Sequence, residues 1–200
     1  KYFSYNKNYV LSNSIEDKFI INKITYKEYL ENYIIIIGTV ANINKCKNLK
    51  LLINIAEYFK SKSDYIFKFH IYGNKTDIDH YENLKDIINH KNLTEEFNFK
   101  GTYANAKDIY DEIDYLIHPT LIESFGRIYL EAMARGIPVI AAKSGASQEI
   151  INNGENGFLH EPDDLSGFLH SIESLTKDSN EYYRISTNAL HTSNNYKLSN

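Results

Sequence analysis

The chain has 200 residues, of which 42% are hydrophobic and 24% are charged, and its formal net charge is −4. This length and composition predict one globular domain with a substantial core, and the mild acidity excludes the strongly basic surface typical of nucleic-acid binding. The single cysteine, Cys46, excludes an internal disulfide framework and a cysteine-cluster metal site.

Residues 1–33 are polar and rich in Asn, and we expect them to form a lead-in segment with one short edge strand at 9–11. The first residue is Lys rather than Met, so we expect the chain to be part of a longer protein. From residue 34 onward, short apolar runs alternate with segments of helical spacing. These patterns predict strands at 34–37, 67–72, 97–99, 115–118 and 139–142. They predict helices at 49–59, 84–88, 109–113, 125–134 and 148–151, and a helical remainder from 163.

Strands that alternate with amphipathic helices predict a parallel sheet covered on both faces. The expected fold of residues 34–200 is therefore α/β, a Rossmann-like three-layer sandwich. In such sheets ligands bind beyond the carboxyl ends of the strands. We therefore expect the loops after Ile37, Tyr72, Phe99 and His118 to line the site.

Two glutamates, Glu123 and Glu131, flank the predicted start of a helix, with a Ser-Phe-Gly turn between them. The first amides of a helix lack intrahelical partners and favour an anion. Glu131 lies five residues past Gly126, or about 7.5 Å farther along the helix. This spacing suits a ligand with hydroxyls at both ends and phosphate in the middle. The alternative is a capping acid followed by an ordinary surface glutamate.

The residues around this pair resemble the signature of retaining glycosyltransferases of the GT-B fold, in the large family four. That signature reads Pro-Ser-x-x-Glu-Ser/Gly-Phe-Gly, then four residues, then Glu-Ala-Met-Ala-x-Gly-x-Pro-Val-Ile-Ala. The matching positions are Pro119, Glu123, Ser124, Phe125, Gly126, Glu131, Ala132, Met133, Ala134, Gly136, Pro138, Val139, Ile140 and Ala141. Thr120 replaces the usual Ser, and the family's later Gly-x-x-Gly turn stands at 154–157. The resemblance runs from about Val10 to Ala189, nearly the whole chain.

The resemblance implies that the chain is the C-terminal, donor-binding half of a GT-B enzyme. Glu123 would contact hydroxyls of the donor sugar and would be the catalytic residue, stabilising an oxocarbenium-like transition state. The backbone of Ser124, Phe125, Gly126 and Arg127 would bind near the sugar and the diphosphate. Glu131 would hold the ribose hydroxyls.

The first strand and its loop depart from the family pattern, which often places an arginine after the strand-end glycine. This chain has Gly38 and Thr39 there, so the position carries no charge. Lys47 is the best candidate to bind the diphosphate instead, with Lys45 beside it, because a lysine ammonium is a mobile point charge. The alternative for both lysines is a solvated helix start.

Other strand ends offer weaker candidates for the donor site. Gly73 is expected to give the ligand room, and Thr102 and Tyr103 lie in the loop where family members grip the nucleobase. Tyr103 would either stack on the base or cover the edge of the sheet. For His118 we expect the backbone to matter more than the ring.

The acidic triplet at 77–79 has the Asp-x-Asp pattern of a metal site, but such triplets are common by chance and the family does not need one. We assign it to solvent and expect neither a metal nor a cofactor, only a nucleotide-diphosphate sugar as substrate. Asp163 and Asp164 are expected to cap a helix, and Glu149 to be a first-turn helix acid.

The function expected from this resemblance is transfer of a sugar from a nucleotide-sugar to a glycan or lipid-linked acceptor. The acceptor would bind through an N-terminal domain outside this chain, so we expect the isolated domain to be inactive. We expect a cytoplasmic protein, either free or peripheral at the inner face of the membrane through those other parts. The alternatives are a GT-B sugar-nucleotide epimerase and a non-catalytic scaffold domain that binds nucleotide or glycan.

Overall fold

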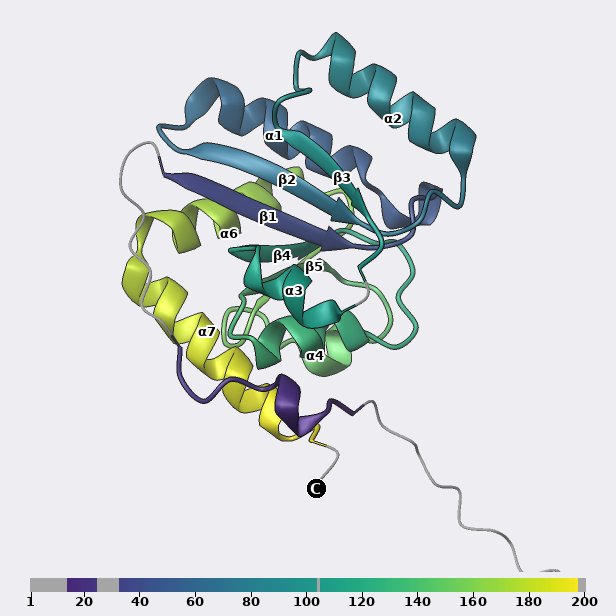
Figure 1. Cartoon of the computed structure of the whole chain (residues 1–200). Helices are drawn as coiled ribbons and strands as arrows, with labels where there is room; N and C mark the ends of the chain where they lie inside the picture. The colour runs from purple at the N-terminus through teal and green to yellow at the C-terminus, as the bar shows by residue number, and fades with distance from the viewer. Residues whose placement is uncertain (1–13, 25–32, 104, 198–200) are drawn as a thin grey trace, which may run out of the picture.

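The computed structural model describes residues 14–24, 33–103 and 105–197 (Figure 1). Its centre is a six-stranded, fully parallel sheet with the strand order β3-β2-β1-β4-β5-β6. The strands are β1 (Ile34–Val40), β2 (Ile66–Tyr72), β3 (Phe97–Gly101), β4 (Tyr115–His118), β5 (Val139–Ala142) and β6 (Phe158–His160). The predicted α/β fold with a parallel sheet is confirmed.

Seven α-helices and two short 3-10 helices connect and cover the strands in the described residues. The 3-10 helices are η1 (Asp17–Phe19) and η2 (Lys45–Lys47). The α-helices are α1 (Lys50–Lys62), α2 (Ile78–His90), α3 (Ala106–Asp111), α4 (Arg127–Ala134), α5 (Ser147–Ile150), α6 (Leu165–Lys177) and α7 (Ser179–Asn194).

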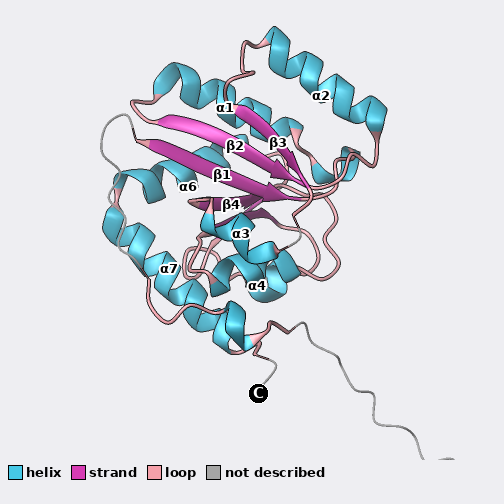
Figure 2. Cartoon of the chain, viewed as in Figure 1, coloured by secondary structure: helices cyan, strands magenta, loops and turns pink. Residues whose placement is uncertain are grey.

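The helices form a layer on each face of the sheet, as Figure 2 shows. On one face, α1, α2 and α6 bury a cluster that includes Leu52, Phe69 and Phe168. On the other face, α3, α4 and α5 bury a second cluster around Leu116 and Leu130. Helix α7 leaves the α6 layer and packs along α4, so it links the two layers. Both faces of the sheet are therefore dry, as the continuous apolar runs predict.

Most predicted elements lie where the periodicity placed them, and β4 and β5 have the predicted bounds. The predicted end of the first strand is wrong, because β1 continues through Gly38 to Val40. Helix α4 begins after Gly126, two residues later than predicted, because Gly126 adopts a left-handed conformation. Strand β6 was not predicted, because it is only three residues long.

The C-terminal part is helical, as predicted, but it is divided at Asp178. The carboxylate of Asp178 accepts hydrogen bonds from the amides of Asn180 and Glu181, at 2.9 and 3.2 Å. It therefore caps α7 where α6 ends. None of the described helices is long and apolar enough to span a lipid bilayer.

Part of the lead-in segment packs onto the domain. The amide of Ile15 donates to Tyr196 O at 2.8 Å, and that of Ile21 donates to Ala134 O at 3.0 Å. Ile15 and Ile24 are buried. The edge strand expected at 9–11 lies outside the described residues.

The strand order places β1 next to β4, where the direction of the connections along the sheet reverses. Loops that leave the carboxyl ends of strands at such a switch point diverge and leave a crevice between them. The loop after β1 contains η2, and the loop after β4 contains the Ser-Phe-Gly turn. These two loops carry most of the predicted site.

Candidate functional site

Two loops that lie far apart in the sequence are joined at this switch point. The amide of Leu121 donates to Cys46 O at 2.8 Å, and the hydroxyl of Thr120 lies 3.2 Å from the same oxygen. Within η2, the side chain of Asn44 accepts from the amide of Cys46. This arrangement brings the ammonium of Lys47 to 3.5 Å from Glu123 Oε2.

Glu123 lies five residues past His118, the last residue of β4. Its carboxylate faces hydrogen-bond donors and a cation. Oε2 lies 3.1 Å from His118 Nε2 and 3.5 Å from Lys47 Nζ. Oε1 accepts from the amides of Gly126 and Phe125, at 3.2 and 3.4 Å. The side chain is 16% exposed, so the carboxylate is held in a fixed position but still reaches the surface.

These donors keep Glu123 ionised. The hydrogen bond from His118 is the largest cause that lowers the pKa of this carboxyl, and the Gly126 amide and Lys47 add to it. Burial acts in the opposite direction, but the pKa still falls from 4.5 to about 2. Glu123 is therefore a carboxylate at every physiological pH, able to accept hydrogen bonds and to stabilise positive charge.

The start of α4 lies beside this carboxylate. Gly126 is the N-cap residue with φ +67°, and a Cβ there would lie 2.8 Å from atoms of Ile150 and Tyr129. Its lack of a side chain therefore allows both the turn and the close packing. Ser124 and Phe125 are exposed. The partial positive charge of the helix start favours an anion at this point.

Glu131 lies on α4 and is 8% exposed. Its Oε2 accepts from the hydroxyl of Tyr110 at 2.9 Å, and its Oε1 pairs with Arg127 Nε at 2.8 Å. Burial raises the pKa of the Tyr110 phenol, so this partner remains a donor. The Arg127 side chain is 68% exposed, so it can move away from Glu131 at little cost.

Gly38 and Thr39 lie inside β1, and neither projects a side chain into the crevice. A Cβ on Gly38 would collide with Ile113 at 2.6 Å. Thr39 is fully buried, and its hydroxyl donates to Ile117 O on β4 at 2.6 Å. Thr39 therefore joins two central strands, and its side chain supplies no charge for a diphosphate.

The two candidate lysines differ in their surroundings. Lys47 points to Glu123 and its side chain is 21% exposed, whereas Lys45 is exposed on η2. The structure therefore favours Lys47 as the cation of the site.

The predicted residues in the loops after β2 and β3 have different surroundings. Gly73 has φ +150°, and a Cβ there would lie 2.1 Å from Ala41 O, so the space at Gly73 is taken by backbone. Thr102 is exposed. The Tyr103 ring packs edge-on against Tyr72 at 5.3 Å, which corresponds to the second of its two expected roles, covering the edge of the sheet.

Glu112 holds this edge together. Its carboxylate accepts from Tyr72, Lys100 and Tyr103, at 3.0, 3.0 and 3.3 Å. The hydrogen bond from Lys100 is the main cause that lowers the pKa of Glu112. The phenol of Tyr103 is thereby fixed at this edge of the sheet.

Three residues outside the predicted set of site side chains lie at the site. His118 contacts Glu123 through its ring at 3.1 Å, although we expected its backbone to matter more than its ring. Gly145 approaches the backbone of Glu123, where a Cβ would lie 2.1 Å from the carbonyl oxygen, and the next amide, of Ala146, donates to that oxygen at 3.1 Å. Tyr110 holds Glu131. The position of His118 directly before Pro119 was an available signal, whereas nothing in the sequence marks Tyr110.

The other acidic candidates have structural roles. Asp77 caps α2 by accepting from the His80 amide at 3.0 Å, and Asp164 caps α6 by accepting from the Gly167 amide at 2.9 Å. Glu149 lies exposed in α5. Among the described residues, no three His, Cys, Asp or Glu side chains are placed to hold a metal ion.

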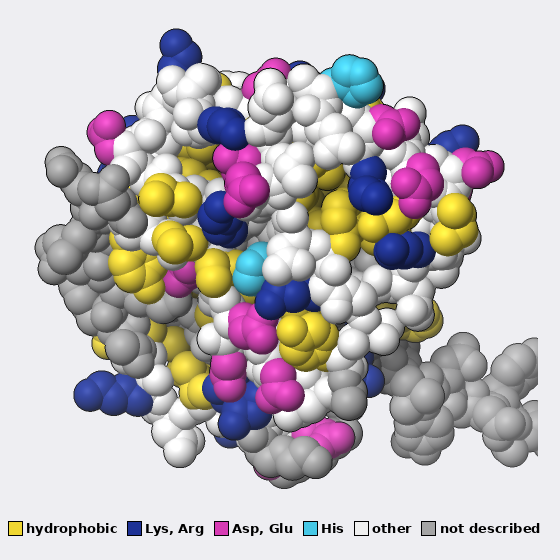
Figure 3. Space-filling model, turned by 45° about the horizontal axis from the view of Figure 1, so that its top comes forward, with side chains coloured by type: hydrophobic (Ala, Val, Ile, Leu, Met, Phe, Trp, Pro, Cys, Tyr) yellow, Lys and Arg dark blue, Asp and Glu magenta, His cyan; other side chains and the backbone are white. Residues whose placement is uncertain are grey.

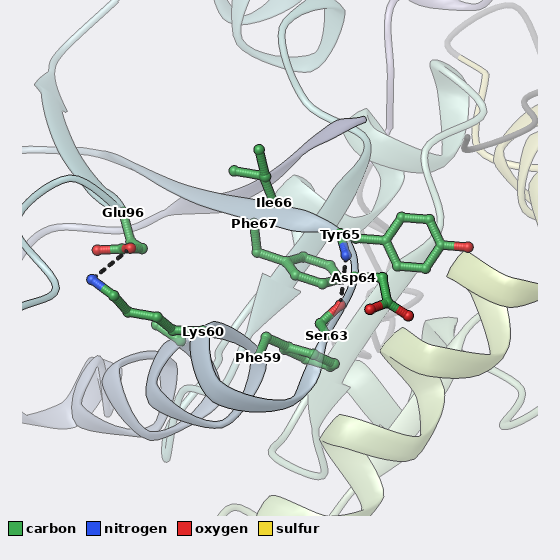
Figure 4. Close-up of a pocket in the computed structure, with 9 residues that line it drawn as sticks. Phe59, Lys60, Ser63, Asp64, Tyr65, Ile66, Phe67 and Glu96 are labelled. Carbon is green, nitrogen blue, oxygen red and sulfur yellow. Dashed lines mark hydrogen bonds and ion pairs between the residues drawn. The ribbon is translucent and has the colours of Figure 1, made fainter. Parts of the chain in front are cut away.

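A hollow of about 500 Å³ lies at the opposite, amino-terminal end of β2 (Figure 4). Phe59 and Phe67 line it, with their rings 4.3 Å apart, and Lys60 pairs with Glu96 at 3.0 Å. The lysine charge is thereby already neutralised. Ligands of α/β folds bind at the carboxyl ends of the strands, and this hollow lies at the opposite end.

The face shown in Figure 3 carries basic and acidic side chains interspersed, without a large area of one sign. This distribution on the face shown agrees with the mild net charge of −4.

The sequence pattern of the family described as "Glycosyl transferases group 1" matches residues 21–192. The chain belongs to this family. A lipopolysaccharide core biosynthesis mannosyltransferase, LpsB of Rhizobium meliloti, is 32% identical over 118 residues, which are 58% of this chain and 34% of LpsB. The sucrose synthase of Thermosynechococcus vestitus is 32% identical over 125 residues, or 57% of this chain and 16% of that protein. The chain thus spans about a third or less of these relatives.

Two solved glycosyltransferase structures have a fold similar to that of this domain. The C-terminal domain of the group 1 glycosyltransferase LpcC of Francisella tularensis is 30% identical, with a TM-score of 0.72 over 82% of this chain and 87% of that one. Anabaena HepE, solved with UDP and glucose, has a TM-score of 0.75 at 24% identity, over 84% of this chain and 45% of HepE. The domain is therefore the C-terminal half of a GT-B fold, the half that binds the sugar donor in this family.

Proposed function

We propose that this domain binds the nucleotide-sugar donor of a retaining glycosyltransferase, which transfers the sugar to a glycan or lipid-linked acceptor. The observation that carries the proposal is the ionised carboxylate of Glu123, held between His118, Lys47 and the start of α4. This position combines a hydrogen-bond acceptor for sugar hydroxyls with two sources of positive potential for a diphosphate.

In this proposal, Glu123 accepts hydrogen bonds from the donor sugar and stabilises the positive charge that develops on it during transfer. The diphosphate lies at the start of α4, against the backbone of residues 124–127, with Lys47 as its cation. The ribose lies next to Glu131, which pairs with Arg127. The backbone around Thr102 and Tyr103 faces the nucleobase.

The chemistry named for the relatives supports this proposal. LpsB is named a mannosyltransferase, and the HepE structures contain UDP, glucose or UDP-glucose. We further propose that the acceptor and the rest of the catalytic cleft come from another domain, because related enzymes are about twice as long or more. The isolated chain should then bind the donor without turning it over. We also propose that the protein acts in the cytoplasm.

Two alternatives remain distinguishable by experiment. A GT-B epimerase is disfavoured by the Ser-Phe-Gly turn and the Glu-Ala-Met-Ala segment, which follow the transferase pattern. A non-catalytic scaffold is supported by the uncharged Thr39. It is opposed by the retention of both glutamates, each fixed by two or more donors.

The direct test is calorimetric titration of the 200-residue chain with UDP-, GDP- and ADP-sugars. At least one should bind with a dissociation constant of millimolar or better. Binding of none of them would contradict the donor-site assignment.

Substitution of the two glutamates tests the roles within the site. In the full-length protein, Glu123→Ala and Glu131→Ala should each lower transferase activity at least tenfold, equivalent to about 1.4 kcal/mol of transition-state stabilisation. The circular dichroism of both variants should match that of the wild type. Unchanged activity in both variants would favour the scaffold alternative.

A further inference from the structure

The ring of His118 is enclosed by protein and is directed at Glu123. His118 is the last residue of β4 and is 1% exposed. Its Nε2 lies 3.1 Å from Glu123 Oε2, and the ring of Tyr129 packs against it edge-on at 5.6 Å. A ring with so little exposure cannot reach a substrate directly, so any effect it has on the site passes through Glu123.

The tautomer of His118 follows from its partner. Burial is the largest influence on this ring and lowers the pKa of His118, so the imidazole is neutral near pH 7. An ionised carboxylate can only accept, so Nε2 must carry the hydrogen and Nδ1 must be bare. Among the described residues, Nδ1 is buried without a hydrogen-bond partner.

This bare nitrogen argues against a role in packing alone. An unsatisfied buried acceptor costs about 1–3 kcal/mol. An apolar ring of the same shape would fill the space without that cost. The Nε2–H group therefore has a role that packing does not require. Among the described residues, its hydrogen-bond partner is the carboxylate of Glu123.

The donors around Glu123 are not equivalent. A carboxylate has about four lone-pair sites, and here His118 and the amides of Phe125 and Gly126 take three of them. Lys47 adds an ion pair at 3.5 Å from Oε2. A sugar hydroxyl that binds Oε2 would compete with this ammonium. Lys47 is the mobile one, and a diphosphate would attract its ammonium. His118 would then be the one side chain still holding Oε2.

We infer that His118 is a positioning residue for Glu123, whose Nε2–H holds the carboxylate in the orientation that accepts the donor sugar after Lys47 has moved to the diphosphate. This inference rests on the proposed donor-binding function. It predicts that His118 strengthens binding of the sugar part of the donor alone. A nucleoside diphosphate without a sugar should not depend on His118.

Three histidine variants of the 200-residue chain test this role. His118→Phe keeps a ring but removes the donor, and His118→Gln restores an N–H near the position of Nε2. His160→Phe is the matched control. His160 is also the last residue of a strand, although it is less buried than His118, and its ring contacts Ser171 at 2.7 Å instead of the site. Each variant is titrated calorimetrically with UDP-glucose and with UDP, and with the GDP or ADP pair if the wild type prefers that base.

His118→Phe should weaken binding of the sugar nucleotide at least fivefold and leave binding of the nucleoside diphosphate within twofold. His118→Gln should recover most of the loss, and His160→Phe should behave as the wild type. Equal weakening of both ligands, or no weakening in His118→Phe, would overturn the inference. Failure of the wild type to bind any donor would instead count against the proposed function.

Two NMR measurements need no ligand. The groups that face Glu123 are His118 from β4, Lys47 from η2 and Tyr129 from α4. With labelled glutamate carboxyls, Glu123 should titrate near pH 2 in the wild type and His118→Gln, and nearer its usual 4.5 in His118→Phe. An unchanged titration would contradict the inference.

The second measurement uses the unsubstituted chain, so it does not depend on whether a variant folds. The ¹⁵N signals of His118 at pH 7 should show a protonated Nε2 and a bare Nδ1. The opposite tautomer would overturn the inference, since Nε2 could not then donate to Glu123.

Discussion

At the level of single residues, the site depends on the groups that hold the carboxylate of Glu123: three hydrogen-bond donors and one ammonium. Glu123 is held on Oε1 by backbone amides and on Oε2 by His118 and Lys47. Backbone donors are fixed by the turn, whereas a lysine can exchange partners. The residue-scale predictions therefore concern Lys47 and the glycine that lets a neighbouring loop approach Glu123.

Lys47→Ala should weaken binding of a nucleoside diphosphate about tenfold, or ~1.4 kcal/mol, because it removes the cation nearest the start of α4. The matched variant is Lys45→Ala, which removes an exposed charge from the same 3-10 helix and should change affinity less than twofold. Calorimetry at low and high salt measures both effects. A larger loss in Lys45→Ala would assign the diphosphate to the other lysine.

Gly145→Ala should disturb the site more than Gly154→Ala does. Both glycines have positive φ, +49° and +78°, so both changes carry about 1–2 kcal/mol of backbone strain. Only at Gly145 would the new Cβ meet Glu123 O at 2.1 Å, whereas nothing lies within 4 Å at Gly154. Donor affinity should fall at least tenfold in Gly145→Ala alone. Equal affinities in the two variants would contradict this reasoning.

At the scale of elements, the site is built where helices and strands end. The start of α4 supplies amides and positive potential, the end of β4 supplies His118, and η2 supplies Lys47. These ends are held in place by helices that pack on the sheet away from the proposed site. Helix α6 shows this clearly, because it covers the far face of β5 and β6 through Phe168, Ile172 and Leu175.

Phe168→Ala should lower the free energy of unfolding by about 3–5 kcal/mol, the usual cost of deleting a buried aromatic ring. Phe168 is fully buried, and its ring lies 5.2 Å from that of His160. The matched variant Phe125→Ala removes the same ring where it is 70% exposed and should change stability by no more than about 0.5 kcal/mol. Urea unfolding compares the two. Similar losses would mean that the α6 layer does not form the core described here.

At the scale of the whole molecule, buried ionisable groups make stability depend on pH. Burial is the main cause that lowers the pKa of His70, His118 and His160 below 6.5. The folded chain therefore binds fewer protons than the unfolded chain as the pH falls below 6.5, and acid favours unfolding. Glu112 and Glu123 have lowered pKa values, so their contribution is present above 4.5 and is lost only below it.

The free energy of unfolding should thus fall between pH 7.5 and pH 5, by an amount of the order of 1 kcal/mol. Urea unfolding at pH 7.5, 6.5 and 5 measures the trend, and the carboxylates should add a second decrease below pH 4.5. His118→Phe, which lacks one of the three histidines, should show a shallower slope between pH 7.5 and 5. A flat profile in the wild type would mean that these histidines keep their usual pKa values.

The class of fold, the family and the elements that carry the signature could all be predicted from the amino-acid sequence. Apolar runs and helical spacing are local properties, so β4, β5 and the parallel alternation could be read without a structure. The contiguous signature around Glu123 and Glu131 was sufficient to predict a donor-binding half of a GT-B fold.

The set of side chains that share the site could be found only from the folded structure. Lys47 reaches Glu123, Thr39 turns to Ile117, and Tyr110 holds Glu131 through contacts between segments far apart in the chain. His118 lies only five residues before Glu123 in the sequence, but its role depends on the packing of Tyr129 from α4 against its ring. These contacts follow from sheet order and packing, which no local pattern encodes, because the partner of a polar group is set by whichever distant loop the folded sheet brings beside it.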